Sequence, residues 1–165
     1  MDFALSEEQT AIFDMAKAFG ATKITPHARD WEAAGKIPKS LWPELAELGF
    51  GGLYVREENG GSGLTRLDAT LVFEALSMAC PSVAAFLSIH NMCAAMIDKF
   101  GSDCLRKKYL PKALSMETFF SYCLTEPGSG SDAAALKTKG DKSNLDYSLT
   151  GTKAFISGGG YSDAY

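Results

Sequence analysis

The stretch YCLTEPGSGSD, Tyr122–Asp132, lies where the pattern of apolar residues along this chain changes. An apolar, strand-like run ends abruptly there in hydroxyl side chains, two acids, one proline and two glycines. Before Met116 the apolar residues recur at helical spacing, whereas Phe119–Leu124 is rich in aromatic and strand-favouring residues. The stretch therefore follows a change from a helical unit to a β unit, the order expected of separate helical and β domains.

Helical signals dominate the first part of the chain. Ser6 and Gln9 form a capping-box pattern at the start of the first helix. Proline, glycine and apolar spacing predict helices from Ser6 to about Ile24, from Pro26 through Trp31, and over 40–48, 67–78, 83–100 and 104–114. The run 83–100 is apolar on nearly every face but contains polar residues, which predicts a central buried helix and not a membrane span.

Sequence patterns typical of β-strands also follow the stretch Tyr122–Asp132. Tyr147–Leu149 and Lys153–Ser157 flank a Thr-Gly turn and predict a hairpin. The expected fold is mainly α, with a helical domain over 1–117 and the first strands of an antiparallel β domain over 118–165. Because about three strands would leave unpaired edges and an exposed apolar face, we expect the chain to be truncated.

Composition narrows the function classes. A net charge of -4 with 46% hydrophobic residues indicates neither a disordered chain nor a nucleic-acid-binding surface. The four cysteines include no C-x-x-C pair, so we expect no metal site and no disulfide framework. The acidic start MDFALSEEQ differs from a targeting leader, which predicts a cytoplasmic protein or an already processed one, such as a mature mitochondrial matrix protein.

Four interpretations of TEPGSGSD compete. A flexible linker fits the Gly and Ser content, but the flanking apolar run disfavours it. A nucleophile elbow fails because 128–131 reads G-S-G-S. Gly128, Gly130 and Ala133 satisfy the G-x-G-x-x-A dinucleotide fingerprint, although the next hairpin pattern leaves too little chain for a crossover helix. A cradle for an anion and a flavin accounts for the glycines and for the hydroxyl donors.

Longer motifs carry a resemblance to a known family. The sequence resembles the acyl-CoA dehydrogenase family in three motifs: YCLTEPGSGSD, KAFISGGG at Lys153–Gly160, and DFALSEEQ near the N-terminus. The resemblance spans all 165 residues. Within the family, the sequence is most similar to the members that act on a short branched-chain acyl-CoA, through the short segments FGGLYV, RLD, FEAL and SIHNMCA.

The resemblance implies an FAD site built by the two longest motifs. The Thr125 hydroxyl would bond to the pyrimidine edge of the flavin, Ser131 would meet the pyrophosphate, and the Ser157 hydroxyl would lie near flavin N5. The sequence has Phe155 and I-S-G-G where the family more often has tryptophan and I-T-N-G. An ordinary strand alternation also suits Tyr122, Leu124 and Phe155 as core residues. The implied cofactor contacts are Tyr122, Leu124, Thr125, Ser131, Phe155, Ile156 and Ser157.

The resemblance also implies substrate contacts. The helix 83–100 corresponds to the one that floors the acyl pocket of the family. Its pocket-facing candidates are Ser88, Asn91 and Met92, and Ser131 is a fourth substrate-binding candidate. His90 and Asn91 equally suit interior polar groups with satisfied hydrogen bonds.

The implied reaction is FAD-dependent α,β-dehydrogenation of a short branched-chain acyl-CoA, with isobutyryl-CoA converted to methacrylyl-CoA in valine catabolism as the expected case. Electrons would pass to electron transfer flavoprotein, and the intact protein would be a homotetramer. Alternatives are another short acyl-CoA such as butyryl-CoA, an oxygen-using relative, and a non-catalytic acyl-CoA dehydrogenase-like binding module.

No catalytic residue is assigned. Glu126 is the tempting acid, but its place beside Pro127 favours a turn-making role, and the catalytic glutamate of the family belongs to a C-terminal helical region that this sequence does not contain. We therefore expect these 165 residues alone neither to turn over substrate nor to retain FAD well.

Overall fold

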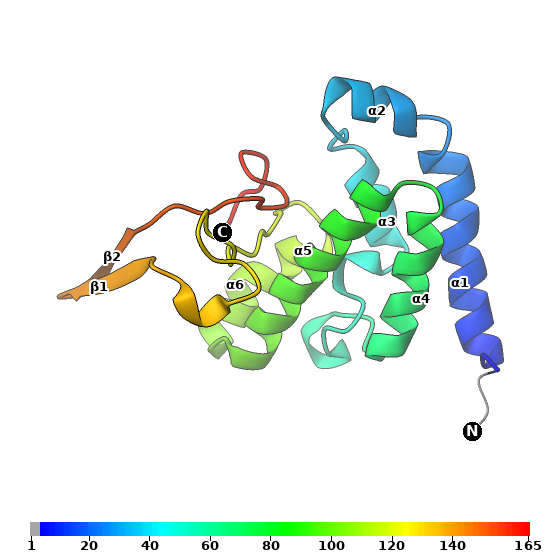
Figure 1. Cartoon of the computed structure of the whole chain (residues 1–165). Helices are drawn as coiled ribbons and strands as arrows, with labels where there is room; N and C mark the ends of the chain where they lie inside the picture. Colours follow the sequence, from blue (N-terminus) through cyan, green and yellow to red (C-terminus); the bar gives the residue numbers. More distant parts are fainter. Residues whose placement is uncertain (1–3) are drawn as a thin grey trace.

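The computed structural model describes residues 4–165 and confirms a mainly α fold (Figure 1). All six expected helices are present, with small shifts at their ends. A π-helical turn, Gly20–Ile24, extends the first helix to the expected residue. The α-helices are α1 Glu7–Phe19, α2 Ala28–Ala34, α3 Leu41–Glu47, α4 Arg66–Ser77, α5 Pro81–Phe100 and α6 Asp103–Leu114, and short 3₁₀ turns cover Phe50–Gly52, Glu57–Asn59 and Ala133–Ala135.

Capping boxes begin both α1 and α4. The Ser6 hydroxyl accepts from the Gln9 amide while the Gln9 side chain accepts from the Ser6 amide, as the sequence predicts. Thr65 and Asp68 repeat the arrangement at α4. The two boxes are joined because Gln9 Nε2 donates to Asp68 Oδ1 at 3.0 Å. One hydrogen bond therefore aligns the starts of two helices that pack side by side.

Helix α5 lies at the centre of the helical part (Figure 1). Its buried residues Val83 and Leu87 belong to the main hydrophobic core, and Cys93 and Ala94 belong to a second core beside α6. No helix within residues 4–165 combines the length and apolarity needed to cross a membrane. The packing of these buried residues in two hydrophobic cores accounts for the apolar character of α5.

A β-hairpin projects away from the helical part (Figure 1). Strands β1, Lys139–Ser143, and β2, Asp146–Thr150, pair antiparallel with Ser143 opposite Asp146. The expected strand at 147–149 is confirmed as part of β2, but its expected partner is wrong. The segment 153–157 is not a strand and includes Phe155 at a φ of +56°, a left-handed conformation that interrupts extended backbone.

The expected strand at Phe119–Leu124 is also absent as a ladder. In this segment only Phe120 forms an isolated bridge, which pairs it with Ala164. The backbone there instead bonds to the end of the described chain, since the Ser121 amide donates to the Ala164 carbonyl at 2.9 Å. The C-terminal segment thus folds back onto the residues that follow α6.

Candidate functional site

The two longest motifs of the sequence lie side by side. The Ala154 amide donates to the Thr125 carbonyl at 2.8 Å, and Lys153 Nζ donates to the Leu124 carbonyl at 2.9 Å. Lys153 also forms an ion pair with Glu126 at 3.0 Å. Contacts of backbone and side chain therefore hold YCLTEPGSGSD against KAFISGGG, although the two motifs are separated by the hairpin in the sequence.

Glu126 organises the loop and is not free to act as a base. Its carboxylate is 7% exposed and accepts hydrogen bonds from the Lys137 amide at 2.7 Å and from the Thr138 amide at 2.8 Å. The Thr138 hydroxyl donates to it as well, and this hydrogen bond is the largest of the effects that lower the pKa of Glu126 to about 2. The carboxylate is therefore ionised and occupied, which agrees with a turn-making role.

The side chains expected to contact a flavin lie at the surface of the loop pair. Tyr122, Ser131 and Ser157 are exposed, and Leu124, Thr125 and Ile156 are partly exposed. Phe155 is 95% exposed, so it is not a core residue of the described chain. A Cβ placed on Gly128 would have no described atom within 4 Å. An uncovered aromatic ring, open glycine backbone and hydroxyl donors fit the demands of a flavin and its pyrophosphate.

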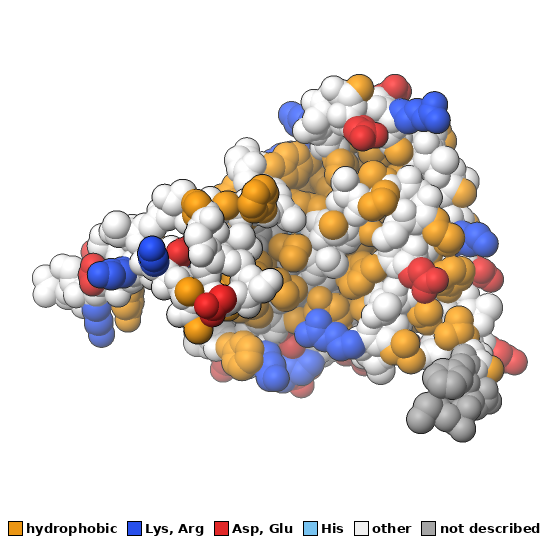
Figure 2. Space-filling model, viewed as in Figure 1, with side chains coloured by type: hydrophobic (Ala, Val, Ile, Leu, Met, Phe, Trp, Pro, Cys, Tyr) orange, Lys and Arg blue, Asp and Glu red, His pale blue; other side chains and the backbone are white. Residues whose placement is uncertain are grey.

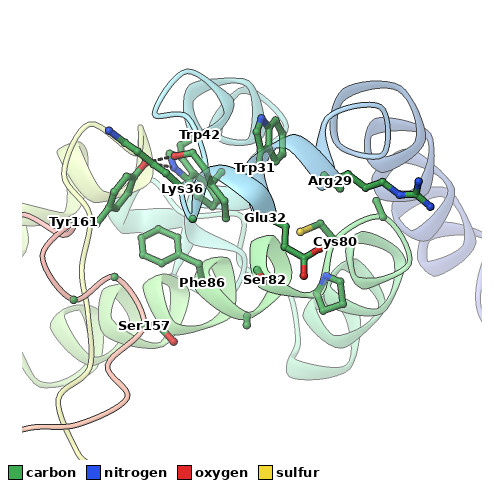
Figure 3. Close-up of a pocket in the computed structure, with 18 of the residues that line it drawn as sticks. Arg29, Trp31, Glu32, Lys36, Trp42, Cys80, Ser82, Phe86, Ser157 and Tyr161 are labelled. Carbon is green, nitrogen blue, oxygen red and sulfur yellow. Dashed lines mark hydrogen bonds between the residues drawn. The ribbon is translucent and has the colours of Figure 1, made fainter.

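A cavity of about 860 Å³ lies between α2, the start of α5 and the segment 156–161 (Figure 3). Hydrophobic side chains gather in the hollow between the C-terminal segment and the helical part (Figure 2). Trp31, Trp42, Phe86 and Tyr161 supply aromatic walls, and Ile156 and Ser157 also line the cavity.

A hydrogen bond connects Trp42 and Tyr161 in the aromatic wall of the cavity. Trp42 Nε1 donates to the Tyr161 hydroxyl at 2.8 Å, and that hydroxyl donates to the Ile37 carbonyl at 3.3 Å (Figure 3). Burial raises the pKa of Tyr161 above its ordinary value. The Phe86 and Tyr161 rings meet edge to face, with centroids 5.7 Å apart. The wall is therefore a joined unit built from three distant segments of chain.

The structure separates the three acyl-pocket candidates on α5 from this cavity. Ser88 is partly buried and donates its hydroxyl hydrogen bond to the Ala85 carbonyl at 2.8 Å, and Met92 is partly buried. Neither lines the cavity, whose α5 lining comes from the first turns, Pro81–Phe86. Sequence reasoning missed Trp42, Tyr161 and these first turns, because no local pattern marks a wall assembled from distant segments.

Asn91 has an interior role in the described chain. It is fully buried, and its side-chain oxygen accepts from the Leu53 amide at 2.7 Å. Its side-chain nitrogen donates to the carbonyls of Phe50 at 2.8 Å and Leu87 at 3.0 Å. These contacts favour the alternative that Asn91 is a satisfied interior polar group.

His90, like Asn91, is a buried polar residue whose side chain has hydrogen-bond partners within the described chain. Its ring is fully buried, its Nε2 donates to the Ala113 carbonyl at 2.9 Å, and its Nδ1 accepts from the Phe120 amide at 3.3 Å. These partners require a neutral ring with the hydrogen on Nε2. Burial lowers the pKa of His90, which is consistent with that neutral form.

Metal-binding geometry is absent from residues 4–165, because no group of three or more His, Cys, Asp or Glu side chains is placed to hold an ion. In the same range, the cysteines at 80, 93, 104 and 123 are all free thiols.

Comparison with known proteins identifies the family. The model described as "Acyl-CoA dehydrogenase, N-terminal domain" matches residues 6–117, and the one described as "Acyl-CoA dehydrogenase, middle domain" matches residues 121–165. The chain belongs to the acyl-CoA dehydrogenase family.

Individual relatives agree with this family. The acyl-CoA dehydrogenase chain is 54% identical over 161 residues to a mitochondrial isobutyryl-CoA dehydrogenase of Dictyostelium discoideum, covering 98% of this chain and 39% of that protein. Butyryl-CoA dehydrogenase from Megasphaera elsdenii superposes with a TM-score of 0.88 at 34% identity, over 99% of this chain and 44% of that one. An FAD complex of PigA superposes with a TM-score of 0.89 at 30% identity, over 99% of this chain and 43% of that one. This chain thus spans about two fifths of the length of the curated relatives it matches.

Proposed function

We propose that this acyl-CoA dehydrogenase chain serves in the FAD-dependent α,β-dehydrogenation of isobutyryl-CoA, a short branched-chain acyl-CoA, to methacrylyl-CoA. The observation that carries the proposal is the hydrogen-bonded pairing of the two motifs through Ala154, Thr125 and Lys153. The identity to an isobutyryl-CoA dehydrogenase supports the choice of substrate. The family matches on either side of the change from helices to extended chain support a division into domains 1–117 and 118–165.

The cofactor residues keep the roles that the motifs imply. Thr125 and Ser131 supply hydroxyl donors toward FAD, and Ser157 supplies a third from the second motif. Tyr122, Leu124, Phe155 and Ile156 supply apolar and aromatic surface beside the ring. When bound, FAD is the acceptor of the hydride that leaves the β-carbon of the substrate. The exposed ring of Phe155 and the open backbone at Gly128 support this assignment.

The acyl thioester would lie over α5. Ser88, Met92 and Ser131 remain proposed contacts, whereas the hydrogen bonds of Asn91 support a structural role for that residue. The aromatic cavity beside Ser157 adds room at the first turns of α5. We assign no catalytic base within these residues, because the carboxylate of Glu126 is already held by Thr138 and Lys153.

Partners and compartment follow from the same proposal. The intact enzyme would act as a homotetramer and pass electrons to electron transfer flavoprotein. The mitochondrial relative supports a place in the mitochondrial matrix, and a bacterial-like protein of this kind would act in the cytoplasm. Dehydrogenation of butyryl-CoA is the second candidate, supported by the superposition on butyryl-CoA dehydrogenase.

An anaerobic titration tests the reaction and the substrate together. Isobutyryl-CoA and then butyryl-CoA are added to protein expressed from the complete gene while the absorbance of oxidised flavin is followed. Preferential bleaching by isobutyryl-CoA is expected. Bleaching by the straight chain alone would reject the branched substrate, and protein purified without any flavin would support the non-catalytic binding module.

A pair of variants tests the cofactor site. Thr125→Val keeps the shape of the side chain but removes the hydroxyl, so FAD should dissociate more readily. Ser148→Ala, on the exposed strand β2, is the matched control and should retain FAD as the wild type does. Equal retention by both variants would contradict the role of Thr125.

A further inference from the structure

Three serines form a chain of hydrogen bonds behind the second motif. Ser121 is 3% exposed, and its hydroxyl donates to the Ser157 carbonyl at 2.5 Å. The Ser121 and Ser162 hydroxyl oxygens lie 2.6 Å apart. Since a carbonyl only accepts, the one hydrogen of Ser121 is committed to Ser157, and Ser162 must donate to Ser121.

The Ser157 carbonyl depends on this contact. Among the described residues, Ser121 is the only donor to that carbonyl. The Ser157 side chain is exposed and lines the aromatic cavity. The serine chain therefore fixes the peptide of Ser157 from behind while leaving the Ser157 hydroxyl available at the surface.

The next residue is glycine because of this packing. Gly158 has a φ of +81°, and a Cβ there would lie closer than 3.0 Å to the hydroxyl oxygens of Ser162 and Ser121 and to the Phe86 ring. A side chain at position 158 would thus push apart the two serines that hold Ser157.

Backbone contacts close the same turn. The Gly158 carbonyl accepts from the amides of Tyr161 at 2.9 Å and Ser162 at 2.8 Å, and from the Tyr165 hydroxyl at 3.2 Å. The turn 157–162 is therefore already compact, and the serine chain adds its connection to the segment that carries the first motif.

We propose that Ser121 and Ser162 are positioning residues that hold the Ser157 turn in place for the flavin. The inference rests on the proposed function, because it gives the buried serines a purpose through the cofactor-facing hydroxyl of Ser157. Loss of the Ser121 hydroxyl frees the Ser157 carbonyl to rotate, and the exposed hydroxyl of Ser157 then loses its defined direction. Loss of the Ser162 hydroxyl removes the donor that orients Ser121 and so weakens the same contact.

Single and double variants test the proposal in protein expressed from the complete gene. Ser121→Ala should speed amide hydrogen exchange over residues 156–162 by about fivefold to tenfold, the loss expected for one buried hydrogen bond. Ser162→Ala leaves the Ser121 donor in place and should speed the exchange by a smaller factor. Each should also shift the visible absorption bands of the bound flavin. The double variant should match Ser121→Ala, because Ser162 acts on the Ser157 carbonyl only through the Ser121 hydroxyl. Ser148→Ala should match the wild type in both measurements.

The outcomes separate the two levels of inference. If the wild type binds flavin but both single variants keep wild-type exchange and flavin spectra, the positioning role is refuted and the proposed function stands. Faster exchange with an unchanged flavin spectrum would also overturn it, because the serines would then be purely structural. Wild-type protein without flavin would overturn the proposed function and this inference with it.

Discussion

Replacement of Asn91 by leucine tests whether this polar residue of α5 supports the fold or contacts substrate. Asn91→Leu keeps a side chain of similar size but removes the partners of the Leu53 amide and the Phe50 carbonyl, both held by short hydrogen bonds. The Leu87 carbonyl keeps its partner, because the backbone amide four residues later bonds to it within the helix. Two backbone groups therefore lose their hydrogen bonds in the interior.

The expected cost follows from those two groups. A buried polar group left without a partner costs about 1–3 kcal/mol, so the two together should lower the free energy of unfolding by about 4 kcal/mol. Because each 1.4 kcal/mol is about a factor of ten, exchange at the Leu53 amide should rise nearly a thousandfold if it occurs by local opening. The loss is largest at the 3₁₀ turn Phe50–Gly52, which Asn91 attaches to α5.

Guanidinium unfolding, followed by circular dichroism and by the fluorescence of buried Trp42, measures the stability. Hydrogen exchange measures the local effect at Leu53. Ser88→Ala, one turn earlier on the same helix, is the control and should change stability by no more than about 0.5 kcal/mol. If Asn91→Leu keeps wild-type stability and exchange but raises the KM for acyl-CoA, the structural argument is wrong and Asn91 is a substrate contact.

Three further predictions concern the loops and the chain as a whole. Because hydrogen bonds hold the pKa of Glu126 at about 2, below the ordinary 4.5, its contribution to stability is present above pH 4.5 and is lost as the pH falls toward 2. Thermal melts of Glu126→Gln should lack this acid-dependent loss, and parallel curves for wild type and variant would count against it. Gly158→Ala should lower the free energy of unfolding by about 1–3 kcal/mol in denaturant melts, because position 158 has a left-handed φ. Gly128→Ala, with open space around it, is the control and should have little effect. Equal unfolding free energies for the two variants would show that the turn relaxes around the new side chain. The 165 residues expressed alone should elute without flavin from gel filtration and show no turnover, and flavin absorbance in the protein peak would contradict this.

The errors of sequence interpretation are confined to the C-terminal part. Strand β1 reads KGDKS and is exposed at every position, so it has no apolar alternation by which to recognise it. The run Lys153–Ser157 has the apolar residues of a strand, but Phe155 takes a left-handed φ there. The hydrophobic pattern thus selected the wrong partner for β2, because every residue of both strands of this hairpin is exposed.

The sequence predicted the chemical type of the site residues more readily than the role of each residue. The sequence motifs were sufficient to name the family and a set of candidate flavin contacts, which remain predictions. They could not distinguish a substrate role for Asn91 from an interior one, because an amide on a buried helix suits both. The hydrogen bonds to Phe50 and Leu53 favour the interior role, which stays a prediction, and they join segments that no local pattern connects.

By itself, the sequence determined the helices of this protein, their order before the extended region, and the two motifs, because caps, proline and glycine breaks and helical periodicity act over a few residues. The tertiary structure alone decided which groups meet. Trp42 and Tyr161 bond across 119 positions of sequence, and Ser121 reaches the Ser157 carbonyl across 36. Such contacts depend on how whole elements pack, since burial in a shared core brings distant polar groups within hydrogen-bonding distance and then requires that they be paired.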